Sequence, residues 1–320
     1  MITIFMETKN EDTCLKIRST RATVAAGLRL YMGNFRRIFR ATWLPALLLA
    51  LASALSYQMM ISTTSRLQNS MAQMAQGHMD GDWMSQYLMQ SGVSLLSFLV
   101  MLLFVSYAFS MLSRHRQEGF IPVPARWLTK PDGRSLARTV AIAMVWFVVG
   151  LIVTVICSIV LALGVVRHSI AIMGISLLLA IVLMALLLPL TYPSMRYVTT
   201  RDTRLFDILG SGYRQGLRYW GYIFAVLFVI ILIAAVILSV TMLPAIVLLT
   251  ANIKAQAGVA MGDALGMPSY MSWMSFLVFT LSGFIQAYVA LAIIFPAYYM
   301  AGSIEQQEIQ RNETTKNTIH

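Results

Sequence analysis

The sequence predicts an all-α, polytopic integral membrane protein with six transmembrane helices and basic amphipathic helices in the cytosol. Six runs of about 20 or more residues have no charge in their cores, and each can cross a hydrocarbon layer as a helix. Charged residues make up 12% of the chain, against about 25% in soluble proteins. Lys and Arg gather in alternate loops. The runs begin near Trp43, Gly92, Thr139, Ser169, Trp220 and Ser272.

The distribution of Lys and Arg predicts which side of the membrane each loop faces. Of the 24 such residues, eight precede the first run, six lie in 114–138, five in 196–218 and two in the tail, while the opposite loops hold only Arg66, Arg167 and Lys254. Lys and Arg stay on the cytoplasmic side of short connections, so both termini are expected in the cytoplasm. The expected domains are a cytosolic N-terminal segment (1–41), a six-helix bundle (42–300) and a cytosolic tail (301–320).

The net charge of +11 narrows the expected partners. The basic residues flank membrane helices instead of forming a separate domain, so anionic lipid headgroups are expected to bind and nucleic acid is not. The first 41 residues lack the apolar core of a cleavable signal peptide. Cys14 is expected in the cytosol and Cys157 within the third span, which excludes a structural disulfide between them.

Residues 20–42 have the periodicity of one amphipathic helix. Its apolar arc holds Val24, Leu28, Tyr31, Phe35, Ile38 and Phe39. Arg29, Arg36 and Arg40 fall on the opposite side, and Arg18 joins them if the helix begins early. Such a helix lies at the headgroup boundary or packs on cytosolic loops of the same protein. The candidate residues for binding the membrane surface are Arg18, Arg29, Arg36, Arg40, Arg214 and Arg218.

The first two spans are expected at 42–61 and 92–112. Pro45 falls in the first turn of the first span, where a missing N–H does little harm. Ala46, Ala50 and Ala54 recur at four-residue intervals and leave a flat stripe against which another helix can pack. A loop rich in Pro and Gly follows the second span.

The third span, expected at 139–163, carries a stripe of small residues that allows close contact with a neighbouring helix and favours a central place in the bundle. The stripe consists of Gly150, Thr154, Ser158 and Ala162. Only residues 164–168 separate this span from the fourth, which ends near Pro193, so the two are expected to form a tight antiparallel hairpin.

The fifth apolar run extends from Trp220 to Thr250, which is too long for one untilted crossing at about 1.5 Å per residue. Pro244 predicts a break in this run. The sixth span is expected at 273–298, and the tail after Glu305 has the composition of a disordered segment.

The chain contains an internal echo at a separation of 185 residues. Gly27, Arg29, Phe35, Ile38 and Phe39 align without gaps with Gly212, Arg214, Trp220, Ile223 and Phe224. In addition, Pro193 and Pro296 each lie near the end of a span that runs from outside to inside. Duplication explains this echo, and so do similar constraints at two points where the chain enters the membrane.

The pattern Gly27-x-Arg29-x-x-x-x-Asn34-Phe35 leads directly into a span, with a weaker copy after Gly212. In this it resembles bacterial six-pass inner-membrane families that include the membrane region attached to some glycerophosphoryl diester phosphodiesterases. The resemblance implies a six-pass protein of the bacterial inner (plasma) membrane. No phosphodiesterase domain is present, so the resemblance carries no catalytic residue to this chain.

The sequence contains no catalytic pattern that we recognise, so neither an enzyme nor a cofactor is expected. All four histidines lie outside the spans, although an enzyme site built from separate loops stays open. In the first outer loop, Met71, Met74 and His78 would share one helix face, and two thioethers with an imidazole suit Cu(I). Packing by flexible methionine side chains is the favoured interpretation, so no metal is expected and the copper site is the alternative.

The function expected from these features is that of a non-enzymatic integral inner-membrane protein that organises lipid or partner proteins. The alternative is the permease subunit of a multicomponent transporter, driven by a separate ATPase and carrying an apolar or lipid-like substrate. An ion-coupled transporter is disfavoured because the cores of the spans contain no carboxylate or histidine.

Overall fold

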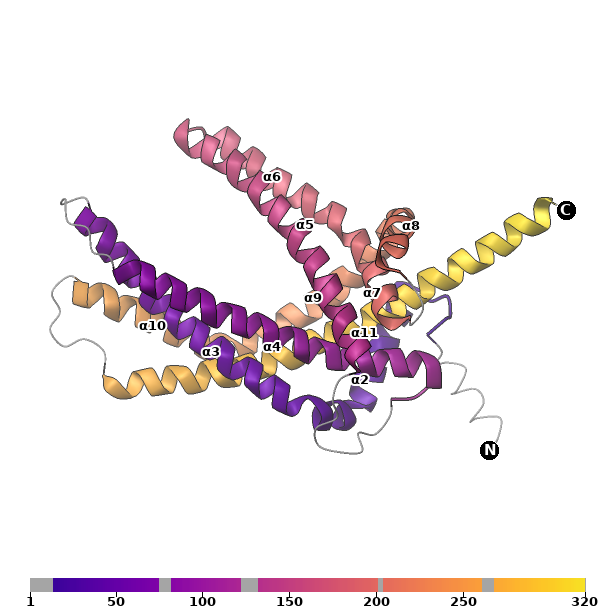
Figure 1. Cartoon of the computed structure of the whole chain (residues 1–320), viewed down its shortest axis with the longest axis horizontal. Coiled ribbons are helices and arrows are strands. Elements are labelled where there is room, and N and C mark those ends of the chain that lie inside the picture. The colour runs from indigo at the N-terminus through magenta and orange to yellow at the C-terminus, as the bar shows by residue number, and fades with distance from the viewer. Residues whose placement is uncertain (1–13, 75–81, 122–131, 201–203, 261–267, 320) are drawn as a thin grey trace. The chain divides into compact units, whose positions relative to one another are not determined.

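The computed structural model describes residues 14–74, 82–121, 132–200, 204–260 and 268–319, and Figure 1 shows these ranges as a set of helices. No strand occurs among the described residues, so the all-α class is confirmed for them. The helices are α2 (Thr20–Gly33), α3 (Phe35–Met74), α4 (Asp82–Glu118), α5 (Gly133–Val166), α6 (Ile170–Leu187), α7 (Thr191–Thr199), α8 (Leu205–Arg218), α9 (Trp220–Thr241), α10 (Leu243–Ala260) and α11 (Ser269–Ile319), with a 3-10 turn, η1 (Leu188–Leu190), between α6 and α7.

Among the described residues, six stretches are long and apolar enough to cross a membrane, and each overlaps one of the predicted runs. They are Phe35–Met60, Tyr87–Glu118, Gly133–Val166, Ile170–Thr199, Trp220–Thr241 and Tyr270–Asn317. The chain is therefore a multi-pass integral membrane protein. The predicted break in the fifth run is confirmed, because α9 ends at Thr241 and α10 begins at Leu243, one residue before Pro244.

Two expectations for the ends of the chain are wrong. The single helix predicted for 20–42 is interrupted at Asn34, whose backbone N–H and side-chain Nδ2 both donate to Leu30 O, at 3.2 and 3.1 Å. The tail after Glu305 is helical as far as Ile319. Its glutamates and glutamines favour a helix, and the first turns of the tail are held by ion pairs that are described below.

The chain divides into two compact units. Unit 1 comprises Met1–Ile38, Ser106–Ile231 and Ala292–His320, and unit 2 comprises Phe39–Val105 and Leu232–Leu291. The helices α3, α4, α9 and α11 each contribute residues to both units.

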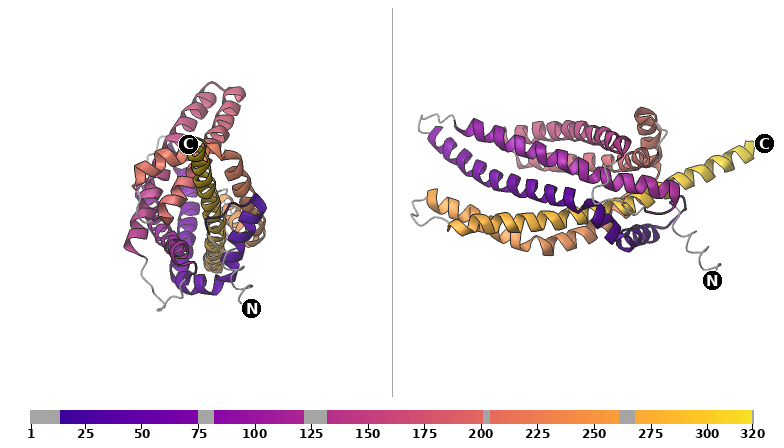
Figure 2. Two further views of the ribbon diagram at one scale, coloured as in Figure 1. Left: turned by 90° about the vertical axis from the view of Figure 1, so that its right-hand side faces the viewer. Right: turned by 60° about the horizontal axis from the view of Figure 1, so that its bottom comes forward.

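Unit 2 uses the alanine stripe of the first span for close helix packing, as the sequence predicts. Ala46, Ala50 and Ala54 are fully buried, and a Cβ added to Gly283 of α11 would lie 3.3 Å from Ala50 Cα. The side chain of Phe279 packs with Ala54 and Ala245 in the same core. Figure 2 shows α3 and α4 running side by side.

Polar side chains join the helices of unit 2 by short hydrogen bonds. The hydroxyls of Ser56 and Ser97 lie 3.0 Å apart between α3 and α4, and Asn252 Nδ2 donates to Ser275 Oγ at 2.9 Å between α10 and α11. Such bonds satisfy polar groups that would otherwise be unpaired in hydrocarbon.

In unit 1, α5 and α6 form the predicted tight antiparallel hairpin, which is visible in Figure 1. His168 turns the chain with a φ of 49°, and Ser169 Oγ caps α6 by accepting from Ile172 N at 3.5 Å. Along the hairpin, Ser176 Oγ donates to Cys157 O at 3.1 Å. A Cβ added to Gly164 would lie 3.0 Å from Met173 Cγ, so the two helices approach closely here.

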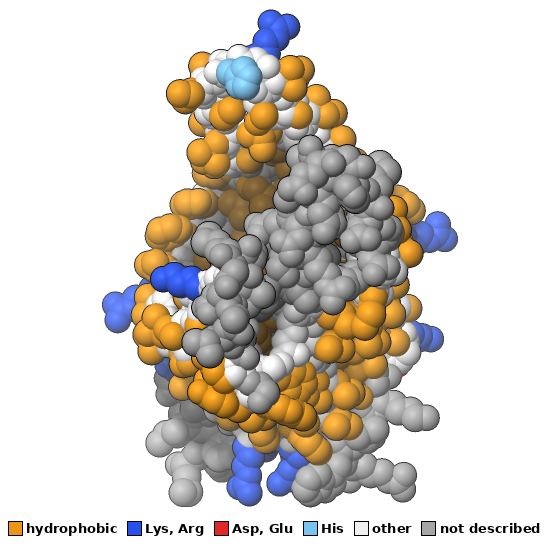
Figure 3. All heavy atoms as spheres, turned by 90° about the vertical axis from the view of Figure 1, so that its left-hand side faces the viewer, with side chains coloured by type: hydrophobic (Ala, Val, Ile, Leu, Met, Phe, Trp, Pro, Cys, Tyr) orange, Lys and Arg blue, Asp and Glu red, His pale blue; other side chains and the backbone are white. Residues whose placement is uncertain are grey.

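The central place expected for the third span is wrong. Only 6% of the residues in the most apolar stretch of α5 are buried, against 39% for the first span. Among the described elements of unit 1, α5 packs mainly on α6, which leaves most of its apolar side chains facing outward. Figure 3 shows the molecule from the left-hand side of Figure 1, and on this face the described side chains are mainly hydrophobic, with scattered Lys and Arg.

The fourth span bends at η1, and side chains of α8 and α9 donate to carbonyls near this bend. Pro189 has no N–H to donate to Ala185 O, which accepts from Leu188 N and also from Trp220 Nε1, the latter at 2.9 Å. The next carbonyl, Leu186 O, accepts from Tyr213 Oη–H at 2.9 Å. A Cβ added to Gly216 would lie 2.6 Å from Pro189 O, so α8 reaches the bend only because this residue is glycine.

The residues of the internal echo make two matching contacts in unit 1. A Cβ added to Gly212 of α8 would lie 2.7 Å from Pro193 Cβ, and one added to Gly27 of α2 would lie 2.7 Å from Pro296 Cγ. Each echoed glycine thus lies against the proline of an echoed span end. We call these contacts the two glycine–proline joints.

Candidate functional site at the arginine-rich end of unit 1

Contacts within unit 1 bring the four basic segments together, and we call this region the arginine-rich end. Arg18 N donates to Ser303 Oγ at 3.0 Å, which joins the N-terminal segment to the tail. Arg37 Nη1 donates to Ile121 O at 3.1 Å, and Arg138 Nη1 donates to Tyr197 O at 2.8 Å. The segments that the charge pattern assigns to one side of the membrane are therefore neighbours in the fold.

A nearly buried ion-pair network links α4, α7 and α11. Arg116 Nη2 donates to both oxygens of Glu305, at 2.9 and 2.7 Å, and Arg196 Nε lies 3.7 Å from Glu305 Oε1. The Arg116 and Glu305 side chains are 15% and 14% exposed. Arg116 Nη1 also donates to Thr199 Oγ1 at 3.4 Å. This network attaches the first turns of the tail to two other helices.

The N-terminal segment is held against α11 beside this network. Cys14 is buried, with its Sγ 3.9 Å from Tyr298 O and its backbone against Gly302. Burial raises the pKa of the Cys14 thiol, and the Tyr298 carbonyl and nearby charges change this only in part. A protonated, buried thiol is a poor nucleophile, so Cys14 serves packing here.

A second group of charges lies between α8 and the tail part of α11. Arg218 Nη1 lies 3.0 Å from Glu308 Oε1, and Arg311 Nη1 lies 3.5 Å from the same oxygen. Beside them is an open groove of about 600 Å³, which we call the α8–α11 groove. It is lined by Gly210, Ser211, Arg214, Gln215, Arg218, Glu308, Arg311 and Asn312. With three arginines and one carboxylate, the groove carries a net positive charge.

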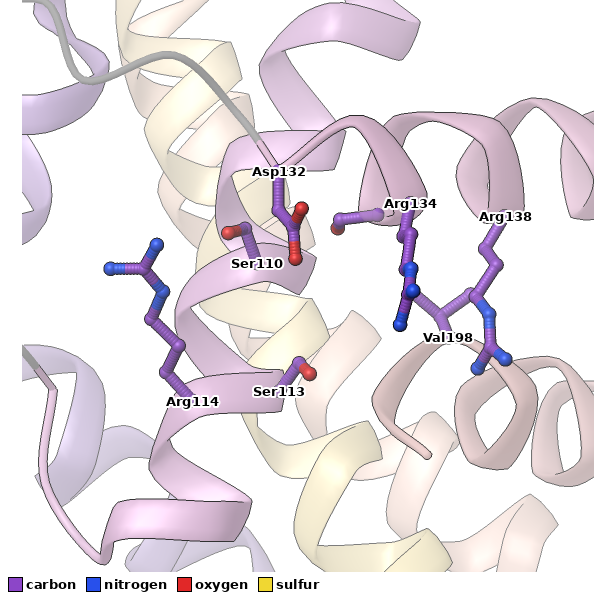
Figure 4. A pocket seen from close by; sticks show the side chains of 8 residues that line it. Ser110, Ser113, Arg114, Asp132, Arg134, Arg138 and Val198 are labelled. Atoms are coloured by element: carbon purple, nitrogen blue, oxygen red, sulfur yellow. The ribbon is translucent and has the colours of Figure 1, made fainter. Parts of the chain in front are cut away.

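A smaller pocket lies where α5 begins, and Figure 4 shows the side chains that line it. The lining comprises Ser110, Ser113, Arg114, Asp132, Arg134, Ser135, Arg138 and Val198. In Figure 4 the Asp132 carboxylate lies near Ser110, while the Arg114 guanidinium extends away from the other side chains. A volume of about 20 Å³ holds a water molecule but not a phosphate group.

The residues predicted to bind the membrane surface fall into two groups. Arg29, Arg36, Arg40, Arg214 and Arg218 are exposed. Arg18 is half-buried, precedes α2, and places its guanidinium 4.8 Å from the centre of the Tyr299 ring. Arg18 therefore belongs to the packing of the N-terminal segment and not to the exposed face of α2.

The apolar face of α2 packs within the protein, as in the second alternative for this segment, but its partner is the helix α11 and not a cytosolic loop. Val24, Leu30 and Tyr31 are buried, and the Tyr31 ring lies 5.3 Å from that of Phe295. Phe35 and Phe39 of the predicted apolar arc belong to α3 and are exposed.

The small-residue stripe of the third span makes no close contact inside the described chain. Thr154, Ser158 and Ala162 are exposed, and a Cβ added to Gly150 would meet no other described element within 4 Å. The α5–α6 contact instead uses Cys157 and Gly164, which at 100° per residue lie beside Gly150 and away from Ala162. Packing of the stripe against a neighbour remains a prediction for a partner outside this chain.

The candidate copper site lies outside what the structure describes. Met71 and Met74 belong to the last turns of α3, but their side chains and the whole of His78 are outside the described residues. Elsewhere in the described ranges, no three His, Cys, Asp or Glu side chains are grouped closely enough to hold a metal ion.

Sequence reasoning missed the pairing of Glu305 and Glu308 with arginines from distant segments. One signal was available, because these two carboxylates lie three residues apart, within one helical turn, directly after the last span. Comparisons of this chain with models of protein families, with curated proteins and with solved structures found no match.

Proposed function

We propose that this chain is a non-enzymatic protein of the bacterial inner membrane that organises anionic lipid or partner proteins at the cytoplasmic surface. The observation that carries this proposal is the arginine-rich end, where exposed arginines adjoin long apolar spans within one compact unit. Each Lys or Arg held near an anionic membrane surface contributes about 1 kcal/mol of attraction. The resemblance to six-pass inner-membrane families belongs to the same proposal.

The residues of α8 support a place at the membrane surface. Its exposed Phe206 and Leu217, with the half-buried Leu209 and Tyr213, fall on one arc at 100° per residue. The adjoining arc is polar and includes Asp207, Ser211, Arg214 and Arg218. A helix with these two arcs can place its apolar side among acyl chains and its arginines among headgroups.

Two aromatic side chains, one in α8 and one at the start of α9, also support a position of α8 at the membrane surface. Tyr213 and Trp220 donate to carbonyls of the bent fourth span, so their rings lie beside a transmembrane helix. Tyr and Trp are enriched at the boundary between hydrocarbon and headgroups. This supports the proposal that the polar arc of α8 lies at headgroup level.

A cytoplasmic orientation of both termini is part of the proposal and follows from the charge distribution. The reading as a non-enzymatic protein is supported by the roles of the polar side chains near the basic segments. Glu305 and Glu308 are paired with arginines, and the Cys14 thiol is buried. These groups stabilise the fold and are not arranged as nucleophile and base.

The proposal is tested by the lipids that leave the membrane with the protein. Discs cut from the native membrane by an amphipathic polymer should contain more anionic lipid around this protein than around a six-pass protein without basic loops. Replacing Arg36 and Arg40 by Gln should reduce the enrichment, because both arginines are exposed. Equal lipid composition in the two kinds of disc would contradict the proposal.

A further inference from the structure

The α8–α11 groove has the charge of an anion site. Arg214, Arg218 and Arg311 face a single carboxylate, Glu308. Glu308 is engaged by Arg218 and Arg311, whereas Arg214 makes no hydrogen bond or ion pair with the residues that the structure describes. An exposed guanidinium without a protein partner is available for a ligand, and its planar donors match phosphate oxygens in pairs.

Neutral hydrogen-bond donors in the groove also favour the binding of an anion. The Gln215 Oε1 atom accepts from Tyr192 Oη–H at 3.2 Å, which fixes the amide and leaves its NH₂ group on the other side. Ser211 and Asn312 complete the lining. The volume of about 600 Å³ lies within the range of small-ligand sites and accepts a phosphate with its attached alcohol.

The position of the groove on α8 favours a lipid over a soluble phosphate ester. At 100° per residue, Gly210 of the groove lining is adjacent on the helix surface to Leu217 and Phe206, which are 41% and 84% exposed. A phosphate in the groove would therefore have apolar side chains next to it for the acyl chains. Tyr213 of α8 and Trp220, the first residue of α9, both donate to carbonyls of the fourth span.

We propose that the α8–α11 groove binds the phosphodiester of an anionic phospholipid headgroup, with Arg214 and Arg311 contacting the phosphate and Phe206 and Leu217 contacting the acyl chains. This inference rests on the proposed function and assigns it one site. Arg218 contributes charge and pairs with Glu308, which reduces the repulsion between that carboxylate and the phosphate.

The test measures phosphatidylglycerol binding to the full-length protein in detergent by native mass spectrometry, with phosphatidylcholine as the neutral reference. Arg214→Gln should weaken phosphatidylglycerol binding about fivefold, and Arg214→Gln with Arg311→Gln about thirtyfold, given the contribution of one arginine near a headgroup. Arg214→Lys should fall between wild type and Arg214→Gln, because it keeps the charge and loses the paired donors. Phosphatidylcholine binding should not change.

Arg204→Gln is the matched control, because it removes one exposed charge just before α8 and outside the groove lining. If wild type binds both lipids equally, the proposed function and the groove site both fail. If wild type prefers phosphatidylglycerol but Arg214→Gln and Arg204→Gln weaken binding equally, the groove site fails and the proposed function stands. A normal thermal unfolding midpoint for Arg214→Gln confirms that the loss is not due to misfolding.

A soluble competitor separates the lipid from a free phosphate ester. Glycerol 3-phosphate at millimolar concentration should leave bound phosphatidylglycerol in place, because it lacks the acyl chains that contact Phe206 and Leu217. Displacement at that concentration would show that the groove selects a soluble phosphate ester and would overturn the lipid assignment.

Discussion

Arg116 of α4 donates from one nitrogen to both carboxylate oxygens of Glu305 in α11, at 2.9 and 2.7 Å. The two residues are 189 positions apart in the chain. Their pairing, with Arg196 on the other side of the carboxylate, holds the start of the C-terminal tail within unit 1. The arginine-rich end is thus a packed part of the protein and not a set of loose basic loops.

Removing the Glu305 carboxylate should destabilise the protein. Glu305→Ala leaves the nearly buried Arg116 and the half-buried Arg196 without a counter-charge, a change that costs about 3 kcal/mol for a buried pair. The midpoint of thermal unfolding in detergent should fall clearly. Glu313→Ala, in the exposed last part of α11, is the control and should have no effect. Equal midpoints for the two variants would show that the ion pair does not hold the tail.

The close contacts at the two glycine–proline joints predict that alanine at either glycine destabilises the protein. Gly27→Ala and Gly212→Ala should each lower the free energy of unfolding by about 1–3 kcal/mol, because the added methyl group overlaps Pro296 or Pro193. Gly33→Ala and Gly210→Ala introduce the same methyl where, apart from the helix's own nearby backbone, no described atom lies within 4 Å, so neither should destabilise. Chemical denaturation of the purified protein distinguishes the two pairs. A neutral Gly212→Ala would mean that α8 does not pack closely on the bend of the fourth span.

The packing of the α5–α6 hairpin predicts different effects on stability for substitutions at two serines. Ser176 is 5% exposed and bonds to Cys157 O across the hairpin, whereas Ser158 is exposed. Ser176→Leu should destabilise by about 1–3 kcal/mol through overpacking, while Ser158→Leu should leave the stability of the isolated chain unchanged. The comparison is made by thermal unfolding in detergent. Destabilisation by Ser158→Leu alone would indicate that the small-residue stripe, and not the Ser176 face, packs inside the chain.

The Cys14 thiol should react slowly with alkylating reagents. Burial raises its pKa, so at a given pH a smaller fraction is thiolate than in an unfolded chain, and the rate should rise only at higher pH. Iodoacetamide labelling followed by mass spectrometry gives the rate at Cys14 as a function of pH. Labelling after unfolding in strong detergent is the control and should follow the ordinary thiol profile. A native Cys14 that reacts as fast as the unfolded chain would contradict the packing against Tyr298 and Gly302.

Local patterns in the sequence were enough to predict the spans and some of their packing. Charge-free runs predicted six crossings, Pro244 the break after α9, and the Ala46–Ala54 stripe a buried helix face, because each depends on residues close together in the chain. The hairpin of the third and fourth spans followed from the short connection.

Features that depend on distant partners were not predictable in the same way. The small-residue stripe of α5 has the same spacing as the alanine stripe of α3, yet only the latter is buried, since burial depends on which helix comes alongside. The helical tail was missed because Glu305 and Glu308 gain their partners from α4, α7 and α8. The arginines of the site were therefore predictable from the sequence, but the groove that they line was not.

The relative affinity of the reconstituted protein for spin-labelled phosphatidylglycerol and phosphatidylcholine tests the central claim most directly. Electron spin resonance measures the fraction of each lipid whose motion is slowed by the protein. We predict at least about a fivefold preference for phosphatidylglycerol near 0.1 M salt, decreasing as salt screens the exposed arginines. Equal association of the two lipids at low salt would contradict the claim that the arginine-rich end binds anionic headgroups.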